Sequence, residues 1–336
     1  MTAGPGPDPG PGEAKARAMA AAALHHWGPA AGPPRLVRRR ENIVFEVRLR
    51  SGQHAALRLH RPGYQSRAGI EAELLWTERL AAAGLPVPPP VRALNGRLTV
   101  RVGDRLASLV GWIDGAPLGA AETPLAGSAA EQAATLAAVG ALAARLHAAT
   151  DALDLPPDFP RPRWDIAGLL GEAPRWGRFW DNPALTPEDR AAVLAAREAA
   201  RAELEAMRGR GADFGLIHAD VLRENVLRTP AGLALIDFDD SGWGFRLYDL
   251  GTAIVQSLEE PALPELAEAV IAGYRSIRPL SAGDAARLSL FVGLRAFASC
   301  GWIATRAPAG DPRQRFYAGR AVRAASAILA GRAIWA

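Results

Sequence analysis

Short apolar runs separated by turn residues mark the first third of the chain, as is typical of β-strands. These strand-like runs cover residues 35–40, 42–49, 54–60, 89–94, 97–102 and 106–113. Ser51-Gly52 separates the second and third runs and is a compact hairpin signal, and Asn95-Gly96 separates the fourth from the fifth. We therefore predict an antiparallel sheet in this part of the chain.

Elsewhere the apolar residues recur at helical spacing. Helices are predicted over 13–26 and 66–83, and from about Glu131 onward long Ala-rich helical patterns dominate. Two segments interrupt these patterns. One is a Pro-rich loop over 155–163, and the other is the stretch 215–242, where two short apolar runs flank a turn and predict a hairpin. A sheet-containing first part followed by a mainly helical second part is an α+β fold class.

One helix has a clear predicted start. Thr186 followed by Pro187 and two acids supplies a capping hydroxyl, a proline in the first turn and carboxylates near the positive end of the helix dipole. We expect this helix to run to Met207 and to stop at Gly209.

The basic residues are almost all arginine. The chain has 336 residues and a formal net charge of +4, and of its 39 Lys and Arg only Lys15 is a lysine. A guanidinium stays charged and cannot act as an amine nucleophile, so Schiff-base and catalytic-lysine chemistry are excluded for the body of the protein. Because 49% of the residues are hydrophobic, intrinsic disorder is excluded for most of the chain.

The cysteine content and the N-terminal sequence indicate the cellular compartment of the protein. A single cysteine, Cys300, excludes an internal disulfide and a multi-thiolate metal site, which fits a reducing compartment. Residues 1–12 are predicted to be a flexible Pro/Gly tail, and Asp8 and Glu13 before a short Ala-rich run do not resemble a secretory signal. No window holds about 18 uncharged apolar residues, the minimum for a membrane span. We predict a cytoplasmic protein without a membrane partner.

Polar residues with catalytic potential gather within 215–242. His218, Asp220 and Asn225 lie close together in the sequence, and Asp237 follows an apolar run on the far side of the predicted hairpin. Phosphoryl transfer needs an acid that orients the attacking hydroxyl and accepts its proton, and oxygen ligands that hold Mg²⁺ against the nucleotide phosphates. The spacing therefore indicates a phosphotransferase site. The alternative is that these side chains only satisfy the backbone groups of a turn.

This pattern resembles the aminoglycoside phosphotransferase and choline kinase superfamily, which has a protein-kinase-like fold. The resemblance covers about residues 20–320. It is closest to the branch of homoserine-kinase-like enzymes and the stress-response Ser/Thr kinase in the stretches ENIVF (41–45), ALRLHRPG (56–63) and ELLW (73–76).

The resemblance implies a two-lobed architecture. A nucleotide-binding N-lobe with a small antiparallel sheet and one helix would cover 13–113, and an interlobe hinge would lie at about 109–115. A larger, mainly helical C-lobe would cover 116–336, with the catalytic loop at 216–242 and helices that bind the acceptor.

The resemblance also implies roles for single residues. Asp220 would be the catalytic base, and Asn225 and Asp237 would be the ligands of Mg²⁺. His218 and Asp249 would support the catalytic loop. The phosphate donor would be ATP.

The nucleotide-binding residues depart from the usual kinase pattern. Where kinases of this shape place a strand lysine paired with a helix glutamate, this chain has Arg58 and Glu73. Arginine binds phosphate through its fork of donors, so we expect an active enzyme. The alternative is that Arg58 is an exposed strand residue and Glu73 a solvated charge.

Two further segments are expected to meet the nucleotide. The turn at 38–42 has no glycine, so a phosphate lid there must use Asn42 and neighbouring backbone N–H groups. Gly111 and Ile113 fall where the family's hinge offers backbone groups to adenine, whereas Trp112 between them is as consistent with core packing.

The acceptor is expected to be a hydroxyl of a small molecule, such as an amino alcohol or a homoserine-like or sugar-like compound. Residues 285–336 carry eight arginines against only Asp311, which disfavours polycationic aminoglycosides, unless these arginines merely form solvated helix faces. A Ser/Thr protein kinase is the alternative, and a non-catalytic nucleotide-binding regulator is a further one. A nucleic-acid partner is not expected, because acids are interleaved with the arginines and the aromatic residues form no RNA-binding motif.

Other candidate residues have simpler interpretations. The adjacent His25 and His26 cannot share a helix face as metal ligands, so we expect both to be exposed. Cys300 has no base nearby in the sequence and is expected to be buried and inert. Asp239 and Asp240 are candidates to assist metal binding, but for Asp240 a cap on the loop before Gly242 is the simpler interpretation.

Overall fold

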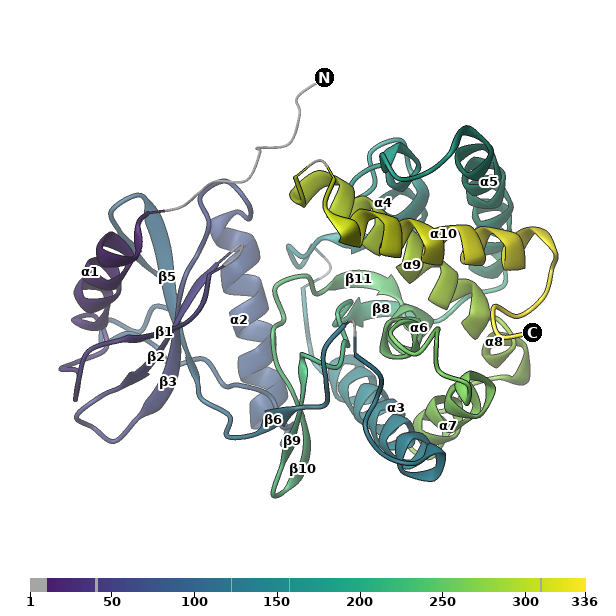
Figure 1. Cartoon of the computed structure of the whole chain (residues 1–336). Coiled ribbons are helices and arrows are strands. Elements are labelled where there is room, and N and C mark those ends of the chain that lie inside the picture. Colours follow the sequence, from purple (N-terminus) through teal and green to yellow (C-terminus); the bar gives the residue numbers. More distant parts are fainter. Residues whose placement is uncertain (1–10, 40–41, 122, 157, 309) are drawn as a thin grey trace. The chain divides into compact units, whose positions relative to one another are not determined.

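A computed structural model of the chain describes residues 11–39, 42–121, 123–156, 158–308 and 310–336 (Figure 1). Most of the tail expected over 1–12 lies outside these residues. The chain divides into two compact units. The first takes its residues from Met1–Gly115, Leu153–Arg161 and Ala234–Asp239, and the second from Ala116–Ala152, Pro162–Leu233 and Asp240–Ala336.

The first unit is built on an antiparallel five-stranded sheet with the strand order β1-β2-β3-β5-β4. Its strands are β1 (Arg35–Arg39), β2 (Ile43–Arg48), β3 (His54–Leu59), β4 (Val100–Val102) and β5 (Arg105–Gly111). The central strands are in register, with Leu57 of β3 opposite Phe45 of β2 and Leu109 of β5. The hairpin expected at Ser51-Gly52 is present between β2 and β3.

Two helices cover opposite faces of this sheet. The small residues of α1 (Glu13–Leu24) are buried in one cluster with Leu57 and Leu109, whereas α2 (Arg67–Ala82) packs through Ile70 against Val110. Because neighbouring strand residues point to opposite faces, Leu109 and Val110 place the two helices on different sides. The unit therefore contains two helices beside its sheet, where the expected fold counted one.

The strand predicted over 89–94 is absent. Only an isolated bridge joins Pro90 to Val110. Proline has no N–H to donate to a sheet ladder, so three consecutive prolines over 88–90 keep this segment from pairing as a strand. The neighbouring run over 97–102 forms the shorter strand β4.

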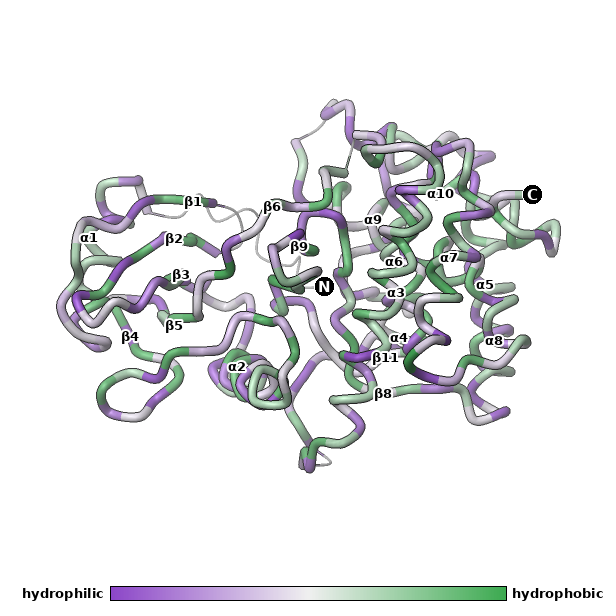
Figure 2. The backbone as a smooth tube through the Cα atoms, turned by 90° about the horizontal axis from the view of Figure 1, so that it is seen from below, coloured by the Kyte–Doolittle hydropathy of each residue, from purple (hydrophilic) through white to green (hydrophobic). Residues whose placement is uncertain are grey.

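The second unit is mainly helical (Figure 1). Its helices are α3 (Ala129–Asp151), α4 (Ile166–Leu170), the 3₁₀ helix η1 (Phe179–Asp181), α5 (Pro187–Gly209), α6 (Leu247–Val255), α7 (Leu263–Arg275), α8 (Ala282–Ala285), α9 (Leu288–Arg306) and α10 (Pro312–Leu329). Hydrophobic and hydrophilic positions alternate along these helices in Figure 2, as expected for helices with one buried face. The predicted start of α5 is confirmed, because Thr186 and Asp189 form a reciprocal capping box.

Further short strands form two small sheets, and the last two residues of one of these strands, Ala234 and Leu235, are assigned to the first unit. One small sheet has the order β7-β11-β8 and another the order β10-β9-β6. The strands are β6 (Ala116–Pro117), β7 (Arg163–Trp164), β8 (Phe214–Ile217), β9 (Val226–Thr229), β10 (Gly232–Leu235) and β11 (Gly242–Phe245). The hairpin predicted within 215–242 is therefore present as β9 and β10.

Two segments have the length and hydropathy of a membrane span, Ala129–Asp151 and Ala282–Arg306. However, 50% of the first apolar window and 72% of the second are buried inside the protein. Burial of this extent is typical of core helices, and α3 and α9 do pack against other helices of the second unit.

Candidate active site

Arg58 lies at the centre of an ion-pair network in the first unit. Its Nη1 donates to Glu73 Oε1 at 2.7 Å, and its Nη2 donates to Asp237 Oδ1 at 2.9 Å. Asp239 Oδ1 lies 3.6 Å from the same Nη2. Arg58 and Glu73 are both buried, so their expected pairing is confirmed and the alternative of two solvated charges is wrong.

The strand geometry explains this position. Leu57 and Leu59 of β3 point into the cluster that contains α1, so Arg58 between them points to the other face, where α2 carries Glu73. Burial alone would lower the pKa of Arg58, but the carboxylates of Glu73, Asp239 and Asp237 outweigh it and raise this pKa above its ordinary value. The guanidinium is therefore a fixed positive charge.

Asp237 and Asp239 offer oxygen atoms that suit a divalent cation. Asp237 has a left-handed backbone, with φ at 66°, and its side chain is about one-third exposed. Burial raises the pKa of Asp239 to about 7, and its Oδ1 has no hydrogen-bond partner among the described residues. An orphaned carboxylate oxygen beside a second carboxylate fits a hard cation such as Mg²⁺.

The described residues contain no group of three or more His, Cys, Asp or Glu side chains arranged to hold a metal by themselves. This is compatible with Mg²⁺, which usually binds through one or two carboxylates together with substrate phosphates and water. Arg161 holds the backbone of the segment 237–239 in place. Its buried guanidinium donates to the backbone oxygens of Asp239 at 2.8 Å and of Phe238 at 3.1 Å.

Asn42 contacts this segment directly. Its amide nitrogen donates to Asp239 Oδ2, and its amide oxygen accepts the backbone N–H of Arg61 at 3.1 Å. Arg38 Nη1 lies 3.4 Å from Asp237 Oδ2. Residues 40 and 41 of the predicted lid turn lie outside the described residues, so the turn's part in nucleotide binding stays a prediction.

In the expected hinge, some backbone groups already have hydrogen-bond partners within the first unit and are not available to adenine. The N–H of Gly111 donates to Pro89 O at 2.7 Å and is therefore not available to a base. Trp112 stacks on His54, with ring centroids 5.0 Å apart, and its N–H donates to the His54 carbonyl oxygen. Trp112 therefore belongs to the packing of the first unit, and adenine contacts at Gly111 and Ile113 stay predictions.

In the second unit, both oxygens of the Asp220 carboxylate have hydrogen-bond donors. Arg295 Nη2 of α9 donates to Oδ1 at 2.8 Å, and Asn225 Nδ2 donates to Oδ2 at 2.7 Å. The Asn225 nitrogen also donates to the Asp220 carbonyl oxygen, so only its amide oxygen can face a cation. His218 Nδ1 accepts the backbone N–H of Asp220 at 3.2 Å.

Asp249 of α6 anchors the start of this loop. Its carboxylate accepts the backbone N–H of His218 at 2.9 Å and of Ala219 at 2.7 Å. Ala219 has a positive φ of 65°, a conformation that costs energy for a residue with a side chain and that these hydrogen bonds hold in place. The contacts are those of the supporting role predicted for Asp249, although its effect on catalysis stays a prediction.

A buried histidine completes this support. His147 of α3 contacts Asp249 Oδ2 through Nε2 at 3.0 Å and the Tyr274 hydroxyl through Nδ1 at 2.9 Å. Burial would raise the pKa of Asp249, but the hydrogen bond and charge interaction with His147 outweigh it and lower this pKa. Burial lowers the pKa of His147, so the pair consists of a carboxylate and a neutral imidazole.

The sequence did not identify Arg161, Arg295 or His147 as residues of the site. A usable signal existed for Arg295, which is the one charged residue in an apolar run over 288–305. A charge in such a run must find a buried partner. His147 and Arg161 gave no comparable signal, because a polar residue is ordinary on an Ala-rich helix and in a Pro-rich loop.

The remaining candidates from the sequence are a cysteine, two histidines and an aspartate. Cys300 is buried, and burial raises the pKa of its thiol to about 12, so it is not a nucleophile. His25 and His26 are exposed, as expected. Asp240 Oδ1 accepts the indole N–H of Trp176 at 3.3 Å, which places it beside the aromatic residues of the second unit.

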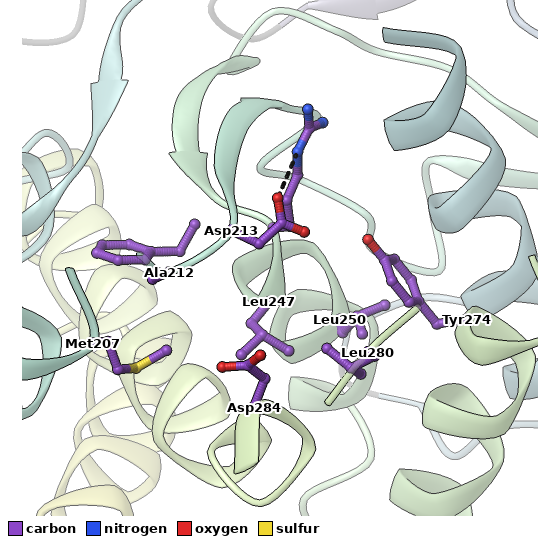
Figure 3. A pocket seen from close by; sticks show the side chains of 10 residues that line it. Met207, Ala212, Asp213, Leu247, Leu250, Tyr274, Leu280 and Asp284 are labelled. Carbon is purple, nitrogen blue, oxygen red and sulfur yellow. Dashed lines mark ion pairs between the residues drawn. The ribbon is translucent and has the colours of Figure 1, made fainter. Parts of the chain in front are cut away.

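A small cavity in the second unit holds none of the predicted residues. Figure 3 shows it between α5, α6 and α7, with Met207, Leu250 and Tyr274 at its wall. Its volume of about 10 Å³ is close to the space of one water molecule, too small for an acceptor.

Comparisons with known proteins agree with this geometry. Residues 34–291 match the phosphotransferase enzyme family. A homoserine kinase of Polaromonas naphthalenivorans (strain CJ2) is 29% identical over 256 residues, which are 73% of this chain and 72% of that protein. The structure of a microcompartment-associated aminopropanol kinase superposes with a TM-score of 0.80 at 31% identity, covering 94% of this chain and 98% of that one.

A more distant structure shares the fold. An amicoumacin kinase in complex with AMP-PNP, Ca²⁺ and Ami superposes with a TM-score of 0.73 at 20% identity, covering 96% of each chain. With the antiparallel sheet and the mainly helical second unit, these neighbours confirm the predicted α+β, protein-kinase-like fold. The chain belongs to the phosphotransferase enzyme family and is a kinase related to those that phosphorylate small molecules.

Proposed function

We propose that this chain is an ATP- and Mg²⁺-dependent kinase that transfers the γ-phosphate to a hydroxyl of a small amino alcohol or homoserine-like compound. The observation that carries the proposal is the Asp220 carboxylate, whose two oxygens are held by Arg295 and Asn225. The acceptors named for its relatives, aminopropanol and homoserine, both carry an amine and a hydroxyl, which supports this acceptor class.

On the donor side, Arg58 would bind the phosphates through guanidinium N–H groups other than those that donate to Glu73 and Asp237, while Glu73 fixes its orientation. The backbone at Gly111 and Ile113 would receive adenine, and Asn42 would support the phosphate end of the site. Asp237, Asp239 and the amide oxygen of Asn225 would hold Mg²⁺. When bound, this ion would neutralise negative charge on the phosphates.

On the acceptor side, Asp220 would accept a hydrogen bond from the acceptor hydroxyl and aim its oxygen at the γ-phosphorus. The new O–P bond forms as the bond between the γ-phosphorus and the β-γ bridging oxygen breaks, so ADP leaves. The hydroxyl proton passes to the Asp220 carboxylate. His218 and Asp249 would keep the loop in the conformation that this transfer needs.

The test is ADP release by the purified protein with ATP and Mg²⁺ across a panel of acceptors. The panel contains 1-amino-2-propanol, ethanolamine, choline, homoserine, a sugar, an aminoglycoside and a generic protein substrate, and Asp220→Ala is the control. We expect turnover with an amino alcohol or homoserine, abolished in the variant. Turnover confined to the protein substrate would favour a Ser/Thr protein kinase, and nucleotide binding without turnover would favour a regulator.

The same proposal includes the location. A kinase that draws on ATP and Mg²⁺ and holds its single cysteine as a buried thiol suits the cytoplasm. Fractionation of cells that express the tagged chain would test it, with the protein expected in the soluble fraction.

A further inference from the structure

Arg295 is a buried arginine with a specific set of contacts. Only 3% of its surface is exposed, and its Nη2 donates to Asp220 Oδ1 at 2.8 Å. Its guanidinium carbon lies 4.3 Å from the centroid of the Trp176 ring, within cation–π distance. Arg295 thus joins the predicted catalytic loop to the segment between α4 and η1.

These contacts fix the Asp220 side chain. With Arg295 on Oδ1 and Asn225 on Oδ2, the carboxylate can neither rotate nor swing away without breaking a charge-assisted hydrogen bond. The side chain of Asp220 is about one-fifth exposed, so a substrate hydroxyl can still reach it.

Stability alone does not account for this arrangement. A buried ion pair gains little or nothing over well-packed apolar residues of similar volume. In addition, the Arg295 guanidinium interacts with the Tyr248 hydroxyl and the Asp240 carboxylate as well as with Asp220. Its surroundings are therefore polar on the side of the catalytic loop, which an arginine retained only for packing would not need.

We propose that Arg295 is a positioning residue for phosphoryl transfer, which holds the Asp220 carboxylate in the orientation that receives the acceptor hydroxyl. The inference rests on the proposed function, since it assigns the partner that makes Asp220 an effective base. The guanidinium would act through geometry and charge, without contacting the transferred phosphoryl group.

Four groups set the charge around Asp220 and Arg295 in the second unit. Asn225 and His218 contact Asp220. The hydroxyl of Tyr248 from α6 and the carboxylate of Asp240 interact with Arg295. Burial raises the pKa of Tyr248 to about 12, so its phenol stays neutral over the working range. Among these groups, the Asp220 carboxylate is the one that accepts a hydrogen bond from Arg295 Nη2.

The chain offers a matched control. Arg320 of α10 is also buried, with 5% of its surface exposed, and its guanidinium lies 4.4 Å from the Phe316 ring centroid and pairs with Glu259. It resembles Arg295 in burial, ring contact and carboxylate partner, but its partner is not in the catalytic loop. Arg320→Met should therefore report the cost of losing a buried arginine.

The experiment compares wild type, Arg295→Met, Arg295→Lys and Arg320→Met in kcat, KM for ATP, and the pH profile of kcat/KM for the accepted substrate. We expect Arg295→Met to lower kcat by about 10- to 100-fold with little change in KM for ATP. The acid limb of the kcat/KM pH profile of Arg295→Met should move to higher pH, because a carboxylate that loses a cationic partner takes up a proton more readily. Arg295→Lys should lower kcat but keep the acid limb near that of wild type.

Thermal unfolding of each variant separates misfolding from positioning, and Arg295→Lys covers the case in which Arg295→Met does not fold. The positioning role is wrong if an Arg295 variant keeps the wild-type kcat and the wild-type acid limb of the pH profile. It is also wrong if the variant changes these two quantities only as much as Arg320→Met does. In both cases the proposed function stands. If wild type turns over no acceptor, the proposed function falls and the inference falls with it.

Discussion

Arg58 joins two carboxylates that are 164 residues apart in the sequence, donating to Glu73 at 2.7 Å and to Asp237 at 2.9 Å. A lysine ammonium is a single charge on a flexible stem, whereas the planar guanidinium presents donors in two directions at once. In this chain, the residue proposed to hold the nucleotide phosphates is therefore also tied to a proposed Mg²⁺ ligand. An arginine at this strand position is compatible with an active kinase for that reason.

Arg58→Met should weaken ATP binding and destabilise the first unit together. The buried Glu73 would lose its main cationic partner, which typically costs about 3–5 kcal/mol. Arg58→Lys should lie between wild type and Arg58→Met in both respects. Isothermal titration with ATP and Mg²⁺, together with differential scanning calorimetry, measures both effects, and the exposed strand residue Arg101→Met serves as the control. An Arg58→Met variant that binds ATP like wild type would contradict the proposed phosphate contact.

Asp220→Asn should abolish most of the turnover while leaving ATP affinity unchanged. Removing a general base typically costs about 10²- to 10⁴-fold in rate. Asp220→Ala should be equally inactive but less stable, because it leaves the buried Arg295 without an oxygen to accept its hydrogen bond, whereas asparagine retains one. Kinetic assay and calorimetry on both variants test this order, with Glu224→Gln in the same loop as the active control. Full activity of Asp220→Asn would refute the assignment of the base.

The sequence predicts best those features whose signals are local. The capping box at Thr186, the hairpin that became β9 and β10, and both helices of the first unit are each specified within a few residues. The failed strand over 89–94 shows the limit of such local signals, because an apolar run beside the Asn95-Gly96 turn predicts a strand although its prolines have no N–H to pair.

Long-range partners were beyond this kind of prediction, apart from those that the family resemblance suggested. Arg58 and Glu73 were paired through that resemblance and are in contact. His147 and Asp249 are about a hundred residues apart, and nothing in the pattern of α3 distinguishes His147 from an ordinary polar residue on a helix. A lone arginine in the apolar run of α9 was the one local indication of the Arg295–Asp220 contact.

Gly273→Ala should destabilise the second unit, because α3 and α7 approach too closely for a side chain there. A Cβ atom on Gly273 would lie 1.8 Å from the Ala137 carbonyl oxygen, so the helices would have to separate. We expect a loss of about 1–3 kcal/mol or more in the free energy of unfolding. Gly319→Ala, on the exposed side of α10 with open space around it, should instead stabilise by up to about 1 kcal/mol. Chemical denaturation of both variants checks the contrast, and equal effects would argue against the close helix contact.

Acidification should destabilise the fold through its buried histidines before it protonates Asp249. Burial lowers the pKa of His147, and it lowers the pKa of His60 to about 3, so the unfolded chain binds these protons at a higher pH than the folded one. Their contribution to stability is complete above about pH 6.5 and declines as pH falls below that value. The pKa of Asp249 is lowered, so its contribution to stability is lost only in more acidic solution.

The glutamine side chain of His147→Gln cannot take up a proton, so we expect the Tm of this variant to fall less steeply than that of wild type between about pH 7 and pH 5. The exposed His26→Gln should keep the wild-type slope. If scanning calorimetry gave His147→Gln the same slope as wild type, His147 would not be the buried neutral partner of Asp249.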